Sequence, residues 1–170
     1  MPFSNRSFRY WVPVILWLTV IVIESLLLSS GVTGGWLWSL VKSLHIPISP
    51  DAFERLHHFL RKAGHVSGYG ILCLLLFRAS YHSLHNSSRH RPTAEFRKGL
   101  RWVCAAIALG GTLLTGALDE WHQSFDPSRT SSVRDVGLDF IGGVIFLTVA
   151  LFVFRAWREL PAPRLETSSA

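Results

Sequence analysis

The sequence predicts an all-α membrane protein with four transmembrane helices and a short interfacial helix in the first outer loop. Charged residues make up only 16% of the chain, whereas soluble proteins carry about 25%. The mean hydropathy is +0.30. Four segments approach the roughly 20 apolar residues that a helix needs to cross a bilayer, and none shows the alternation of a β-barrel strand.

The four predicted transmembrane segments are separated by more polar connections. They run over Trp11–Leu28, Phe59–Ala79, Leu100–Leu118 and Val136–Phe154. Because Arg6 and Arg9 precede the first segment, it could also be a secretory signal peptide. Its apolar run exceeds the 7–15-residue core of such peptides, so we interpret it as an uncleaved helix.

The positive charges predict an orientation. With the N-terminus in the cytoplasm, eleven of the 17 Lys and Arg residues lie on the cytoplasmic side and six on the other. Cytoplasmic loops carry the excess of positive charge in membrane proteins, so we expect both termini in the cytoplasm. We therefore divide the chain into a cytoplasmic N-terminus (1–10), a membrane domain (11–155) and a cytoplasmic tail (156–170) whose polar, proline-containing composition predicts disorder.

The connection from Ser29 to His58 is long for a loop between two helices. Its apolar residues from Trp36 to Leu44 recur near helical spacing, which favours a short helix in the outer interface, ended by Pro47 and Pro50. A covering loop is the alternative, and the sequence does not decide between the two.

Several functional classes find no support in the sequence. The net charge of +6 belongs to residues beside apolar runs, where it suits anionic lipid rather than nucleic acid. Cys73 and Cys104 lie inside apolar segments and show no disulfide or zinc spacing. No cofactor motif is present, so we expect neither a cofactor nor a metal, and we expect membrane lipids as partners.

Ionisable residues gather near the predicted outer ends of all four helices. Charged groups inside a bilayer are costly and usually face one another, so these residues predict a polar cluster directed into the bundle. Lys62, His65 and Tyr69 share one face of their helix, and Gly142 and Gly143 permit close helix approach. The other members are Glu24, Asp119, Glu120, Gln123, Asp135 and Asp139.

The order of these residues resembles the VanZ-like family. The motifs are Lys62-x-x-His65-x-x-x-Tyr69, then Asp119-Glu120-x-x-Gln123-x-Phe125-x-Pro127-x-Arg129, then Asp135-x-x-x-Asp139-x-x-Gly142. The family often has Asn where this chain has Asp139. The resemblance implies a small multi-pass protein of the bacterial inner membrane. The family's namesake is linked to resistance to the glycopeptide teicoplanin, but the resemblance does not imply resistance for this chain.

The cluster allows four interpretations. In the preferred one, it recognises an anionic or glycosylated envelope component, such as a lipid-linked precursor or a glycopeptide. Lys62, His65 and Arg129 would hold the anionic group. Tyr69 and Asp139 would line the site, while Glu120, Gln123 and Asp135 orient the cations.

The other interpretations use the same residues differently. His65, Glu120 and Asp135 could perform acid–base chemistry on a lipid-linked substrate. The charges could also pair purely to hold the bundle together. A metal site would need sharper ligand spacing than the sequence shows.

Overall fold

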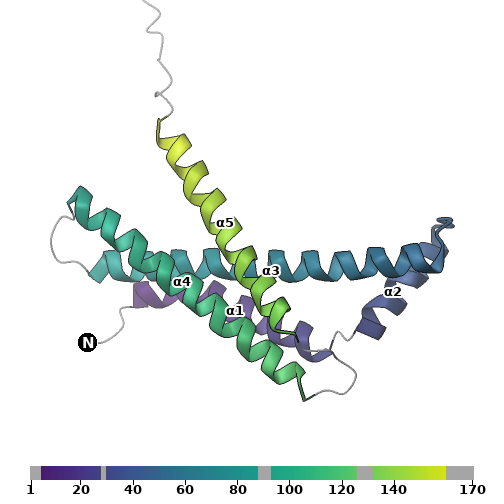
Figure 1. Ribbon diagram of the computed structural model, residues 1–170. Helices are drawn as coiled ribbons and strands as arrows, with labels where there is room; N and C mark the ends of the chain where they lie inside the picture. The colour runs from purple at the N-terminus through teal and green to yellow at the C-terminus, as the bar shows by residue number, and fades with distance from the viewer. Residues whose placement is uncertain (1–4, 28–29, 88–92, 126–131, 160–170) are drawn as a thin grey trace, which may run out of the picture.

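The described part of the chain folds into five helices. The computed structural model describes residues 5–27, 30–87, 93–125 and 132–159, and these residues contain helices but no strand. Figure 1 shows α1 (Asn5–Leu27), α2 (Ser30–Ser43), α3 (Pro50–Ser87), α4 (Ala94–Gln123) and α5 (Val133–Glu159).

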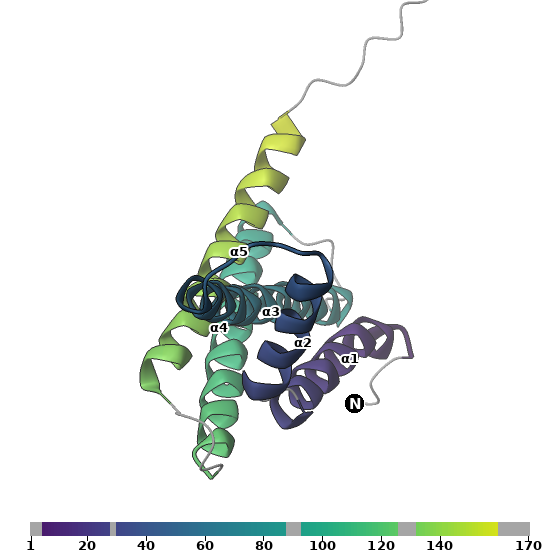
Figure 2. The ribbon, with the colours of Figure 1, turned by 90° about the vertical axis from the view of Figure 1, so that its right-hand side faces the viewer.

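The long helix α3 is the centre of the molecule. Each of the other four helices packs against it, and a view along its axis shows α1 on one side with α4 and α5 crossing on the other (Figure 2). Its middle is closely packed: Leu72 and Cys73 are fully buried. A Cβ atom added to Gly70 would overlap the Phe146 ring of α5, so the absence of a side chain there lets the two helices meet.

Among the described residues, three helices are long and apolar enough to cross a membrane, over Phe8–Leu26, Glu95–Gln123 and Val133–Val153. They correspond to the first, third and fourth predicted segments. Helix α3 does not qualify, because its continuous apolar run extends only from Ile71 to Phe77. The prediction of a multi-pass helical protein is thus supported, with three candidate spans.

The helix boundaries differ from the predicted ones. Helix α3 begins at Pro50, nine residues before the predicted start at Phe59, because proline suits the first turn of a helix and Ser49 accepts a hydrogen bond from Ala52 N. The connection before it contains α2, which is longer than the predicted interfacial segment. Helix α5 continues to Glu159, so the start of the predicted disordered tail is helical; residues 160–170 lie outside the described part of the chain.

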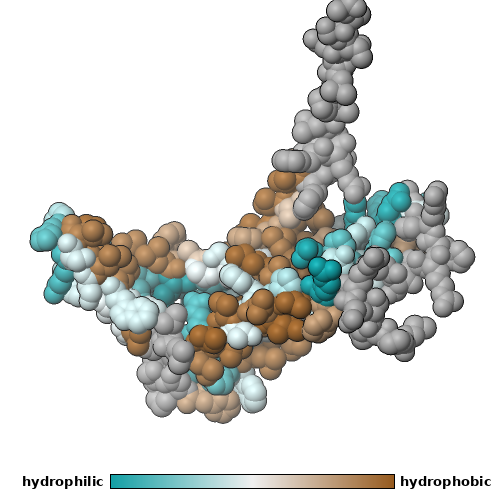
Figure 3. All heavy atoms as spheres, turned by 180° about the vertical axis from the view of Figure 1, so that it is seen from behind, coloured by the Kyte–Doolittle hydropathy of each residue, from teal (hydrophilic) through white to brown (hydrophobic). Residues whose placement is uncertain are grey.

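The outer surface of the bundle is apolar. Figure 3 shows hydrophobic side chains over the middle of one face, with hydrophilic ones toward the ends. Leu16 and Ile23 of α1 and Phe152 of α5 are among the large exposed apolar residues. Such continuous exposure is unusual for a soluble monomer and suits contact with lipid chains.

Candidate functional site

A small polar hollow lies where α1 and α4 end, beside the middle of α3. Its volume is about 60 Å³, which is more than one water molecule needs and suits a small charged group. We call it the polar hollow. Its lining residues are Ile21, Glu24 and Ser25 of α1, Thr33 of α2, Arg61, Gly64, His65, Gly68 and Tyr69 of α3, and Asp119 and Gln123 of α4.

Helix α3 supplies one wall of the polar hollow. Arg61, His65 and Tyr69 recur every four residues and therefore share a face, and Gly64 and Gly68 leave space between them. The Trp17 indole of α1 donates to Gly68 O at 2.9 Å. This bond fixes α1 against the same stretch of α3 and uses a carbonyl beside the hollow.

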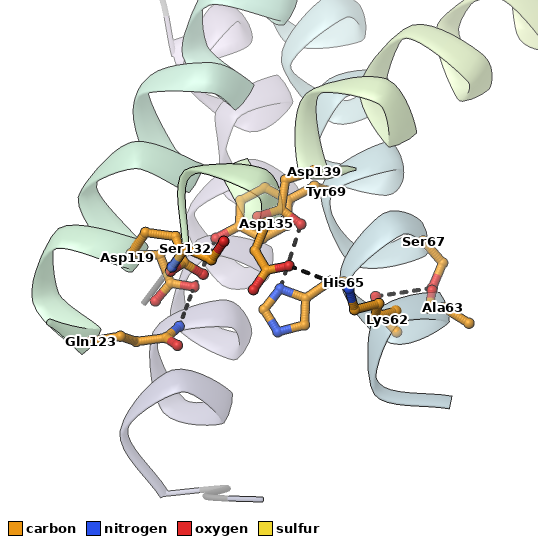
Figure 4. Close-up of polar contacts among 12 residues, drawn as sticks. Lys62, Ala63, His65, Ser67, Tyr69, Asp119, Gln123, Ser132, Asp135 and Asp139 are labelled. Atoms are coloured by element: carbon orange, nitrogen blue, oxygen red, sulfur yellow. Dashed lines mark hydrogen bonds and ion pairs between the residues drawn. The ribbon is translucent and has the colours of Figure 1, made fainter. Parts of the chain in front are cut away.

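Asp119 of α4 closes the opposite wall. Its Oδ2 atom accepts hydrogen bonds from the Tyr69 hydroxyl and from Gln123 Nε2, both at 3.0 Å (Figure 4). Gln123 lies one helical turn after Asp119, so its amide can reach the carboxylate within α4. The two bonds join α3 to α4 and hold the Asp119 carboxylate in place.

The buried carboxylate of Asp139 faces His65. The Asp139 side chain is 1% exposed, and its Oδ1 atom lies 3.4 Å from His65 Nδ1. Neither atom has a hydrogen bond in the described structure, so the contact is an ion pair when the imidazole is protonated. A buried carboxylate is costly unless it is paired, and His65 is the cation in contact with it (Figure 4).

One glycine allows this close approach. A Cβ atom on Gly142 would collide with the backbone carbonyl of Val66, next to His65. A Cβ atom on Gly116 would make an ordinary contact with Asp139, 3.4 Å from its Oδ2 atom. The helices α3 and α5 therefore meet nearly backbone to backbone at Gly142, and the Asp139 side chain lies against α4 at Gly116.

The remaining predicted site residues lie beside the polar hollow rather than in its lining. Lys62 Nζ lies 3.8 Å from Asp135 Oδ1, so this lysine has a carboxylate partner. Glu120 Oε2 accepts the Ser132 backbone N–H at 2.8 Å, just before α5 begins, where a negative charge stabilises a helix start. Of the three candidates for acid–base chemistry, His65 lines the hollow. Arg129 lies outside the described residues.

Two polar residues of the site were not singled out from the sequence. Thr33 Oγ1 of α2 lies 3.5 Å from Arg61 Nη1 and 3.1 Å from His57 Nε2, and it joins α2 to the polar hollow. Ser25 contributes a buried hydroxyl without a hydrogen bond to the described residues. The sequence feature nearest to Thr33 that relates to this contact is Gly34, whose missing side chain leaves room for the His57 ring.

No group of three His, Cys, Asp or Glu side chains in the described part of the chain is arranged to hold a metal ion. The two cysteines, Cys73 and Cys104, are buried and unpaired.

Comparisons with known proteins place the chain in one family. No curated protein and no solved structure matches it. The sequence model of the VanZ/LLP1 family, however, matches residues 10–155, which include all five helices except their outermost ends and the whole polar hollow. The motifs around His65, Asp119 and Asp139 predicted this relationship, and the match confirms it: the chain belongs to the VanZ/LLP1 family.

Proposed function

We propose that this chain is a membrane protein that binds the anionic headgroup of a cell-envelope component in the polar hollow. The observation that carries the proposal is the presence of Arg61 and His65 on one wall of a small hollow. Guanidinium and imidazolium groups form strong, charge-assisted bonds to phosphate and carboxylate oxygens. Three hydroxyls, from Ser25, Thr33 and Tyr69, lie in the same lining.

The size of the polar hollow limits what enters it. About 60 Å³ suits a small charged headgroup better than a disaccharide or a glycopeptide. The sugar of a glycosylated or lipid-linked ligand would therefore remain outside, with only a small charged headgroup inside.

The geometry favours binding over catalysis. Two of the three acid–base candidates have structural partners, because Glu120 accepts a hydrogen bond from Ser132 N and Asp135 pairs with Lys62. Neither of them lines the hollow. A general acid or base has to reach the reacting atoms. Binding requires only the groups that the hollow presents.

We further infer that α3 is the fourth transmembrane helix. With 38 residues it is about 57 Å long, which exceeds the ~30 Å hydrocarbon core. The buried residues from Tyr69 to Ala79 are shielded from lipid by the other helices, so this part can span the membrane with modest hydropathy. Both termini would be cytoplasmic in a bacterial inner membrane, with the polar hollow facing outward.

The binding proposal can be tested with purified protein in detergent. Native mass spectrometry would count bound dihexanoyl-phosphatidylglycerol at increasing lipid concentration. We expect Arg61→Gln and His65→Gln to weaken binding about tenfold each, because each removes a charge-assisted bond worth roughly 1.5–3 kcal/mol.

His58→Gln is the matched control, because His58 is an exposed histidine of the same helix outside the lining of the hollow. Equal binding by all three variants and the parent would contradict the proposal. A teicoplanin susceptibility assay with the same variants tests the link to glycopeptide resistance, which requires that Arg61→Gln and His65→Gln lose any protection the parent gives.

A further inference from the structure

The polar hollow carries charges of both signs on different walls. Arg61 and His65 lie on α3, whereas Glu24 belongs to α1 and Asp119 to α4. A purely anionic ligand would neutralise the first pair and be repelled by the second. The charges of the lining therefore favour a ligand that carries a positive group as well as a negative one.

The two carboxylates are available to such a group. The described hydrogen bonds of Asp119 go to Oδ2, no hydrogen bond of Oδ1 to the described residues is found, and the residue lines the polar hollow. The Glu24 side chain is exposed, and neither ion pair found among the described residues includes it. Asp139, by contrast, is buried against His65 and does not line the hollow.

We propose that the ligand class is a zwitterionic headgroup of the phosphoethanolamine type, a phosphate joined to a primary amine by two carbons. This inference rests on the proposed function and narrows it. The phosphate lies toward Arg61 and His65, and the ammonium lies between Glu24 and Asp119. A primary ammonium has three N–H donors, which suits two carboxylates and a hydroxyl such as that of Ser25.

The position of the polar hollow suits a lipid headgroup. It lies where α1 ends at Leu27 and α4 ends at Gln123, and therefore at the depth where an apolar span gives way to the interface. Ser25 Oγ is buried and has no hydrogen bond to the described residues, and a donor such as an ammonium would satisfy its lone pairs. An unsatisfied buried polar atom is costly, so this hydroxyl favours a polar occupant.

Related lipids separate the contributions of the two charges. Phosphatidylglycerol has the phosphate without an amine, and phosphatidylcholine has a quaternary amine without N–H donors. With the full chain in detergent and short dihexanoyl forms of each, native mass spectrometry should give phosphatidylethanolamine about tenfold tighter binding than either of the other two lipids.

Glu24→Gln is the decisive variant, because it removes one carboxylate from an exposed position without disturbing the core. We expect it to weaken phosphatidylethanolamine binding about tenfold and to leave phosphatidylglycerol binding unchanged or slightly stronger. Glu95→Gln, an exposed carboxylate at the opposite end of α4, is the matched control and should change neither. Asp119→Asn provides a second test of the same wall.

The outcomes distinguish this inference from the proposal beneath it. Equal binding of phosphatidylethanolamine and phosphatidylglycerol, with no effect of Glu24→Gln but a loss in Arg61→Gln, would overturn the zwitterion and retain anion recognition. Absence of binding by all three lipids, or binding indifferent to Arg61 and His65, would overturn both. Equal binding of phosphatidylcholine and phosphatidylethanolamine would overturn the proposed primary amine, because phosphatidylcholine has no N–H donor for the carboxylates.

Discussion

The middle of α3, at the polar hollow, and its C-terminal end both carry histidines but use them differently. At the polar hollow, His65 contacts the buried carboxylate of Asp139 and faces a space. Toward the C-terminal end, His82 stacks flat on Tyr10 of α1 with ring centroids 4.4 Å apart, and Arg78 lies over the same Tyr10 ring. We call this second region the aromatic end; it also contains the bond from Trp11 Nε1 to Ser83 Oγ.

The difference separates a binding site from a structural contact. At the aromatic end, the Tyr10 and His82 rings stack across α1 and α3, and the Trp11 indole N–H donates to the Ser83 hydroxyl. At the polar hollow, groups from four helices converge on a space, and a buried hydroxyl remains without a described partner. Histidine alone therefore does not identify the site; carboxylates and an unfilled volume beside it do.

The largest expected effect on stability and binding comes from a substitution that disrupts the helix packing around the polar hollow. In Gly142→Leu, the new side chain would collide with the Val66 backbone and force α5 away from α3. Overpacking at such a contact costs about 3 kcal/mol, so thermal unfolding in detergent should occur at a clearly lower temperature and lipid binding should be lost.

Gly137→Leu is the matched control on the same helix, because a Cβ atom there meets nothing within 4 Å. Equal stability of the two variants would contradict the close packing of α3 and α5 around Asp139.

A smaller effect is expected from Asp139→Asn, which keeps the shape of the side chain and removes the charge that faces His65. The Asp139 carboxylate favours the protonated form of His65. Its removal would leave the imidazole neutral more often, so phosphatidylglycerol binding should weaken several-fold, by about 1 kcal/mol. Native mass spectrometry measures the change, and Asp51→Asn, an exposed carboxyl at the start of α3, should not show it. Tighter binding by Asp139→Asn would mean that Asp139 repels the ligand instead of supporting His65.

The smallest effect concerns the aromatic end. Burial against Tyr10, with further contributions from Arg78 and His85, lowers the pKa of His82 below its ordinary value of 6.5. The folded state therefore disfavours the extra proton, and this contribution to stability is lost as the pH falls below about 6.5. The fall in unfolding temperature between pH 7.5 and pH 5.5 should be smaller in His82→Phe than in the parent. An identical fall in unfolding temperature in both proteins would contradict the lowered pKa of His82.

The sequence predicted much of the fold but not the full length of α3. Apolar runs indicated the middle of α1, α4 and α5, because a helix that crosses a bilayer needs a long apolar segment, which is easily recognised in a sequence. The start of α3 was missed because Asp51–His58 alternates charged and apolar residues, a pattern that hydropathy alone does not assign to a continuous helix.

The candidate site was predicted in part for a similar reason. Spacing placed both Arg61 and Lys62 within one turn of His65. We predicted that Lys62 would hold the anion, whereas the residue that lines the hollow is Arg61. The rotation of α3 in the packed molecule decides, and the close approach of Gly142 to the Val66 backbone is one contact that holds α3 against α5 there. Thr33 could not be predicted because α2 reaches the hollow through tertiary contacts with His57 and Arg61.

The most direct test of the central claim is an electron cryomicroscopy structure of the protein in nanodiscs that contain phosphatidylethanolamine and phosphatidylglycerol. We predict headgroup density in the polar hollow, with phosphate beside Arg61 and His65 and the amine between Glu24 and Asp119. A polar hollow without lipid density, with headgroups ordered elsewhere on the protein, would contradict the account.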